Sequence, residues 1–93
     1  MARSAARLLI DGRVQGVGYR WWAVETARSL GLDGWVRNRA DGSVEILAIG
    51  EAEQIRQLAK ACRTGPPGAS VRSVKAEAAD TDGSKGFAQK PTA

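Results

Sequence analysis

The chain has 93 residues, of which 43% are hydrophobic, and a net charge of +4 from 14 Lys and Arg against 10 Asp and Glu. This length predicts one domain spanning residues 1–93, because two hydrophobic cores need a longer chain. The sequence has no histidine and one cysteine, which excludes Ser-His-Asp and Cys-His relays, a Cys/His zinc site and an intrachain disulfide. The basic balance suits an anionic ligand, but more often it indicates only a soluble domain with a mixed surface.

The N-terminal segment gives an expectation about the compartment. Its longest apolar run, residues 8–10, is too short for a signal-peptide core or a membrane span. A lone cysteine also fits a reducing compartment. We therefore expect a cytoplasmic protein with no membrane partner.

The first third of the chain predicts a strand, a loop and a helix. The apolar run 5–12 is typical of a strand, and residues 13–19, with two glycines, predict a loop. A helix is predicted over 20–30, and Gly31 ends it as a residue that takes the left-handed conformation without strain. The residues that repeat at helical spacing are Ala23, Ala27 and Leu30.

The middle of the chain predicts a hairpin and a second helix. Strands are expected at 34–39 and 43–49, because Asp-Gly between two β-prone runs is a strong hairpin signal. A helix is expected over 52–63, ended by the Gly-Pro-Pro-Gly segment 65–68. Its apolar stripe consists of Ile55, Leu58, Ala59 and Cys62, and Cys62 is interpreted as a core residue.

The last third predicts a fourth strand at 70–78, a polar loop at 80–86 and a short edge strand at 87–90. The order β-α-β-β-α-β, plus a short fifth strand, predicts an α+β fold of the ferredoxin-like, split βαβ type. Such a fold has an antiparallel sheet with both helices on one face. Many unrelated functions use this fold, so function must come from a site.

The segment 12–20, GRVQGVGYR, indicates an anion site. It leaves a strand and enters a helix, where backbone N–H groups lack partners and the helix end carries partial positive charge. Gly16 and Gly18 let the backbone curl around a ligand, and the guanidinium of Arg20 can hold two phosphate oxygens. A tight turn without function is the simpler interpretation of any glycine-rich loop. The segment lacks the Gly-Lys-Ser/Thr of a Walker A loop and the third glycine of a dinucleotide fingerprint.

A second candidate is Asn38, near the end of a predicted strand where asparagine is uncommon. Its amide can both donate a hydrogen bond to a water and accept one, although it could instead cap the hairpin. Arg37 and Arg39 are interpreted as residues of a solvated face. Asp11 and Asp41 are interpreted as turn residues.

Three segments together resemble the acylphosphatase family: 12–20, then 34–38 (GWVRN) with Gly42, Val44 and Gly50, then Gly65-Pro66-Pro67. The resemblance extends from about Leu8 to Val74. Two departures lie outside these motifs. The segment 87–90 is a weaker version of the family's apolar last strand, and Trp21-Trp22 is bulkier than expected and is interpreted as packing.

The resemblance implies hydrolysis of acyl phosphates to a carboxylate and inorganic phosphate, without a metal or other cofactor. It implies that Arg20 is the catalytic arginine and that Asn38 positions the attacking water, while the substrate's own phosphate accepts the proton. The residues implied to bind the phosphate are Gln15, Gly16, Val17, Gly18 and Tyr19.

Two other function classes stay open at this point. One is a module that binds phosphate or carbamoyl phosphate without turnover. The other is an RNA-binding ferredoxin-like domain, which needs aromatic residues on the open sheet face, and the strand 43–49 has none. We expect a monomer with a small acyl phosphate as substrate and no nucleic-acid partner. The sequence does not identify the acyl group.

Overall fold

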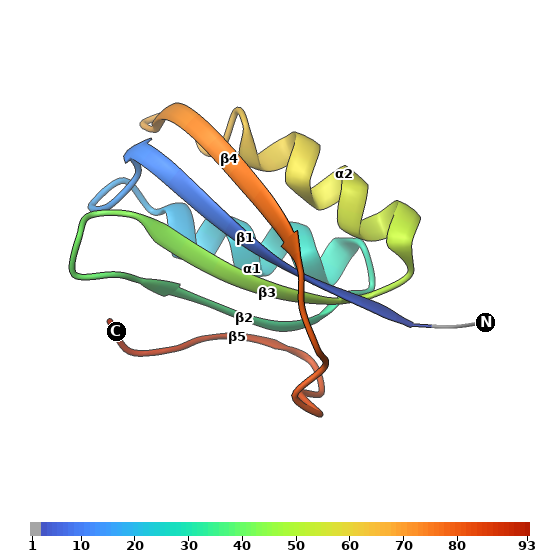
Figure 1. The fold of residues 1–93 in the computed structure, drawn as a ribbon. Coiled ribbons are helices and arrows are strands. Elements are labelled where there is room, and N and C mark those ends of the chain that lie inside the picture. Colours follow the sequence, from blue (N-terminus) through green and yellow to red (C-terminus); the bar gives the residue numbers. More distant parts are fainter. Residues whose placement is uncertain (1–2) are drawn as a thin grey trace.

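The structure, a computed structural model, describes residues 3–93. Two helices and five strands follow one another in the predicted order. Their bounds are β1 Ser4–Arg13, α1 Tyr19–Ser29, β2 Asp33–Asn38, β3 Val44–Gly50, α2 Ala52–Cys62, β4 Ser70–Ala78 and β5 Phe87–Gln89. The α+β ferredoxin-like fold predicted from the sequence is confirmed, and both helices lie on the same face of the sheet (Figure 1).

The strands are ordered β4-β1-β3-β2-β5 across the sheet. The four long strands pair antiparallel, as predicted, whereas β5 pairs parallel to β2 with Phe87 opposite Gly34. The sheet is therefore mixed rather than wholly antiparallel. The reason is the path of residues 79–86, which connect β4 at one edge of the sheet with β5 at the other (Figure 1).

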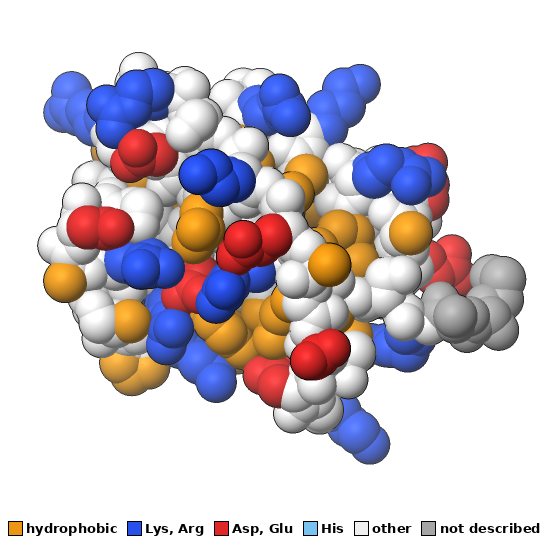
Figure 2. All heavy atoms as spheres, viewed as in Figure 1, with side chains coloured by type: hydrophobic (Ala, Val, Ile, Leu, Met, Phe, Trp, Pro, Cys, Tyr) orange, Lys and Arg blue, Asp and Glu red, His pale blue; other side chains and the backbone are white. Residues whose placement is uncertain are grey.

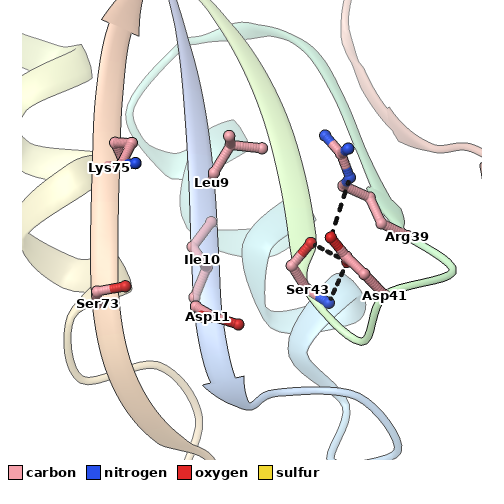
Figure 3. A pocket seen from close by; sticks show the side chains of 8 residues that line it. All are labelled: Leu9, Ile10, Asp11, Arg39, Asp41, Ser43, Ser73 and Lys75. Carbon is pink, nitrogen blue, oxygen red and sulfur yellow. Dashed lines mark hydrogen bonds and ion pairs between the residues drawn. The ribbon is translucent and has the colours of Figure 1, made fainter.

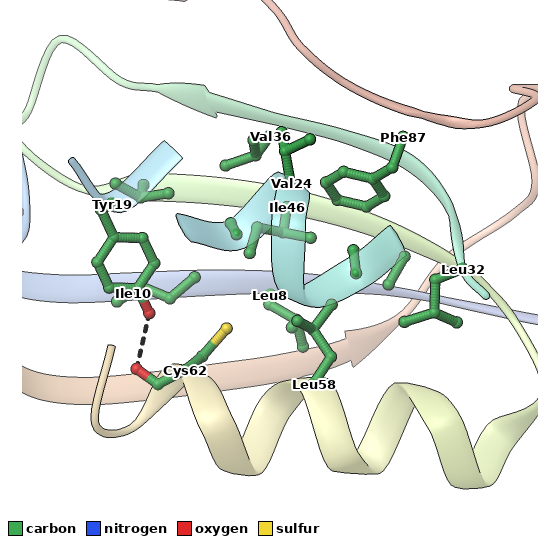
Figure 4. Packing of buried hydrophobic residues seen from close by; sticks show 14 of the residues in the cluster. Leu8, Ile10, Tyr19, Val24, Leu32, Val36, Ile46, Leu58, Cys62 and Phe87 are labelled. Atoms are coloured by element: carbon green, nitrogen blue, oxygen red, sulfur yellow. Dashed lines mark hydrogen bonds between the residues drawn. The ribbon is translucent and has the colours of Figure 1, made fainter. Parts of the chain in front are cut away.

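The core lies between the sheet and the two helices (Figure 4). Strand side chains alternate between faces, so every second residue of β1, β2 and β3 points toward the helices. The fully buried strand residues on this face are Leu8, Ile10, Val36, Val44, Ile46 and Ala48. They meet the predicted stripe of α2 and the α1 residues Ala23, Val24 and Ala27. Burying each large apolar side chain stabilises the fold by roughly 1.5–3 kcal/mol.

The open face of the sheet carries Lys, Arg, Asp and Glu side chains next to one another (Figure 2), and several of them form ion pairs. Glu45 on β3 is only 1% exposed, and its carboxylate binds Arg37 Nε at 2.7 Å and Arg7 at 3.4 Å. The connection 79–86 also lies against this face, where the Trp35 indole N–H donates to Asp82 at 3.0 Å. Arg37 lies on this open face with its side chain 33% exposed, as the prediction of a solvated face allows, and it also neutralises a buried carboxylate.

Candidate functional site

The loop between β1 and α1 takes a conformation that requires glycine. Gly16 and Gly18 have φ of 74° and 79°, in the left-handed region that other residues rarely adopt. A Cβ at either position would meet nothing within 4 Å. Backbone conformation, rather than lack of space, therefore requires glycine here, and the space beside the loop is open.

The first turn of α1 has unused hydrogen-bond donors. Gly18 is the N-cap residue, no side chain caps the helix, and its first turn has no acidic residue. Among residues 3–93, no hydrogen bond occupies the backbone N–H groups of residues 16–21. Several N–H groups thus surround the positive end of a helix dipole, an arrangement that favours an anion.

Gln15 fixes this loop to the β2–β3 hairpin. Its side-chain Nε2 donates to the backbone oxygens of Arg39 and Ser43, at 2.8 and 2.9 Å. Both amide hydrogens are therefore used within the protein. Only the backbone of Gln15 is thus available to donate a hydrogen bond to a ligand. Its side chain fixes the position of the loop relative to the hairpin.

Tyr19 anchors the helix start in the core. Its ring is 1% exposed, and its hydroxyl donates to the Cys62 carbonyl at 2.7 Å (Figure 4). Burial, together with that contact, raises the pKa of the phenol far above its ordinary value. The phenol is thus a neutral structural group, and only the backbone N–H of Tyr19 is available to a ligand.

Arg20 and Asn38 lie at the same end of the molecule. Strands β1 and β2 both run antiparallel to β3, so both end where α1 begins. Asn38 is two residues beyond Val36, whose side chain is buried under the helices, so the two side chains share a face. Arg20 is the second residue of α1, the helix that begins at this end of the same face. The topology thus places the arginine, the asparagine and the loop donors at the same end of the molecule.

Comparison with known proteins decides which family has this arrangement. Residues 6–89 match the model of the acylphosphatase family. The chain belongs to the acylphosphatase family. An acylphosphatase of Rhizorhabdus wittichii is 52% identical over 92 residues, which cover 97% of this chain and 91% of that relative. Family membership makes the chain an enzyme that hydrolyses acyl phosphates, rather than a module that only binds them.

Solved acylphosphatase structures have the same fold. The acylphosphatase of Coxiella burnetii superposes with a TM-score of 0.91 at 33% identity, covering 95% of this chain and 93% of that one. The Bacillus subtilis acylphosphatase gives a TM-score of 0.89 at 36% identity, covering 92% and 97%. The mixed sheet and its two helices are therefore the acylphosphatase architecture.

Trp21 corrects the prediction that both tryptophans of the acylphosphatase helix are packing residues. Trp22 does pack, meeting Tyr19 edge to face with ring centroids 5.2 Å apart. Trp21 is instead 65% exposed. The exposure of Trp21 could have been predicted from the helical period. Tyr19, Ala23 and Ala27 define the buried face, and Trp21 lies about 200° around the helix from Tyr19.

A hollow of about 220 Å³ on the open face of this acylphosphatase domain is a competing location for a site (Figure 3). Its carboxylates are already engaged. Asp41 accepts from the hydroxyl and N–H of Ser43, which lowers the pKa of its carboxyl, and Asp11 pairs with Arg72 at 2.7 Å. Neither carboxylate is poised to take a proton. Asp41 lies in the turn between β2 and β3, as predicted. The interpretation of Asp11 as a turn residue is wrong, because β1 continues beyond this position and Asp11 pairs with Ser73 of β4.

Two further findings concern metals and membranes. Among residues 3–93, no group of three or more His, Cys, Asp and Glu side chains could hold a metal ion together. Over the same residues, neither helix has the length and apolar character needed to cross a bilayer.

Proposed function

We propose that the chain hydrolyses acyl phosphates without a metal, through a phosphate site formed by the loop after β1 and Arg20, with Asn38 holding the attacking water. The observation that supports this proposal best is the uncapped start of α1, whose free N–H groups lie at the end of the molecule that also carries Arg20 and Asn38. The phosphate donors would be the backbone N–H groups between Gln15 and Tyr19.

Hydrolysis of an acyl phosphate requires no covalent intermediate with the protein. Phosphoryl transfer passes through a loose transition state, so positioning and charge stabilisation supply most of the acceleration. The Arg20 guanidinium would hold two phosphoryl oxygens, while the loop amides neutralise the rest. The Asn38 amide would orient a water in line with the phosphorus–oxygen bond that breaks.

The proposed reaction needs no side chain of the protein as a base. The water oxygen bonds to phosphorus, the carboxylate leaves with the electrons of the broken bond, and the water's proton passes to a phosphate oxygen of the substrate. Arginine remains protonated at any working pH and cannot serve as the base. Asp11 is paired with Arg72 and Asp41 accepts a hydrogen bond from Ser43, so neither carboxylate is free to act as the base. This supports a role of the substrate's phosphate as the proton acceptor.

Release of inorganic phosphate from benzoyl phosphate, measured in excess EDTA, tests the proposal. We expect the same rate with and without the chelator. Phenyl phosphate, a phosphate ester with a poorer leaving group, is the control and should be hydrolysed far more slowly. A rate abolished by EDTA and restored by a divalent cation would overturn the metal-free mechanism.

We further propose that the chain acts as a cytoplasmic monomer with no nucleic-acid partner. The single thiol, Cys62, is buried, and burial raises its pKa to about 12, so it suits a reducing compartment without taking part in disulfide exchange. Sedimentation analysis should give a mass near 9.9 kDa. A gel-shift assay with single-stranded RNA should show no binding.

A further inference from the structure

Trp21 is the one large hydrophobic side chain that is exposed among residues 3–93, at 65%. Nothing in the fold explains it, because Trp22 already supplies the aromatic contact to Tyr19. Other large apolar side chains of the helices, such as Ile55 and Leu58, are buried. A single exposed apolar side chain needs no explanation by itself, but an indole close to a candidate ligand site is available to contact the ligand.

The position of Trp21 in the helix places its indole near the anion-binding loop. Gly18 is the N-cap, so Trp21 is the third helical residue, one after Arg20. Helical side chains tilt toward the N-terminus and cover the surface one turn before their own Cα. For Trp21 that surface is the mouth of the loop, where the free N–H groups of residues 16–18 lie.

A second apolar surface borders the same loop. Val17 at its tip is half-buried and packs on the core. The turn after α2 lies against it, since a Cβ built at Gly68 would stand 3.4 Å from the Val17 Cβ. A group that leaves the loop mouth therefore meets apolar atoms as well as the charge of Arg20.

We propose that Trp21 contacts the acyl group of the substrate, and that the preferred substrates are acyl phosphates with an aromatic or otherwise flat, apolar acyl group. This inference rests on the proposed phosphate site, because a phosphoryl group held by the loop leaves the acyl group one P–O–C linkage away. Indole stacks on flat apolar groups. The neighbouring charge of Arg20 disfavours acyl groups that carry an ammonium.

Relative rates on two substrates test this role. The ratio of kcat/KM for benzoyl phosphate to that for acetyl phosphate should fall roughly 3- to 10-fold in Trp21→Ala, the scale of one aromatic contact. Trp21→Phe keeps an aromatic ring and should restore the ratio to within about twofold of the wild-type value. Glu25→Ala, an exposed position one turn further along the same face of α1, is the matched control and should leave the ratio unchanged.

Binding measured without turnover separates this inference from the proposed function. Benzylphosphonate should compete for the site more strongly than methylphosphonate in the wild type, and Trp21→Ala should remove this difference while leaving inhibition by inorganic phosphate unchanged. A wild type that hydrolyses neither substrate overturns the proposed function. A wild type that hydrolyses both, with a substrate ratio and a phosphonate difference that Trp21→Ala does not change, overturns the role of Trp21 alone.

Discussion

Arg20 occupies the one place in the first turn of α1 where a permanent cation meets unpaired backbone donors. Replacing it with alanine should lower kcat/KM on benzoyl phosphate by about 10³-fold or more, the scale of an arginine in phosphoryl transfer. Arg20→Lys should recover little of the loss, since an ammonium cannot form the same bidentate contact. Steady-state kinetics on purified variants measure both effects.

The control for Arg20 is an exposed arginine on the other helix, α2. Within residues 3–93, Arg56 pairs only with Glu53 on its own helix, at 3.1 Å. Arg56→Ala should keep wild-type kinetics. An Arg20→Ala enzyme within tenfold of the wild type would show that the loop amides alone bind the phosphoryl group.

Asn38 has a different expected kinetic effect, because its proposed partner is the water rather than the phosphate. Asn38→Ala should lower kcat by roughly 10²-fold or more, the scale of losing one well-placed polar contact. The inhibition constant of inorganic phosphate should stay within about threefold of the wild-type value, since the loop and Arg20 are unchanged. Loss of phosphate inhibition together with turnover would make Asn38 a phosphate ligand instead.

At the scale of elements, the proposed mechanism depends on how the β1–α1 loop is held against the β2–β3 hairpin, and Gln15 makes that connection. Gln15→Ala removes two hydrogen bonds and should lower the free energy of unfolding by about 1–2 kcal/mol. It should also reduce kcat by about tenfold, because the loop then shifts relative to Asn38. Urea unfolding and kinetics measure the two effects.

Gln15→Glu distinguishes donation from mere volume. Glutamate has a similar size but no N–H group, so its carboxylate would face two carbonyl oxygens. Gln15→Glu should lower the free energy of unfolding and kcat by at least as much as Gln15→Ala does. Gln57→Ala, at an exposed position on α2, is the control. A Gln15→Glu variant with wild-type stability and activity would remove the positioning role of Gln15.

The order of the elements and the glycine conformation of the β1–α1 loop could be predicted from the sequence, because the signals are local. The roles assigned to Arg20 and Asn38 stay predictions. Helical stripes, the Asp-Gly turn and the glycine loop each depend on residues within one turn or one hairpin. The parallel pairing of β5 could not be predicted, since it depends on the path of 79–86 across the sheet. Nor could the burial of Glu45, whose partners come from β1 and β2.

At the scale of the whole molecule, residues 79–86 connect the two edge strands of the sheet, β4 and β5. Asp82 holds this connection against the open face of the sheet. Its carboxylate accepts hydrogen bonds from the hydroxyl and N–H of Ser84 and from the Trp35 indole, with Lys90 nearby. These contacts lower the pKa of Asp82 from 3.8 to about 2. A carboxyl with a lowered pKa stabilises the fold above its unfolded pKa and loses that contribution as pH falls through its folded value.

The indole N–H resonance of Trp35 should therefore keep its position as pH falls from 7 to about 4, and move only as pH approaches about 2. Asp82→Asn has no titrating group there, so the low-pH movement should disappear while the resonances of Trp21 and Trp22 behave as in the wild type. Two-dimensional NMR resolves the three indole groups. A wild-type transition centred near pH 4, or one that persists in Asp82→Asn, would mean that the connection is held by other contacts, such as the β5 pairing with β2.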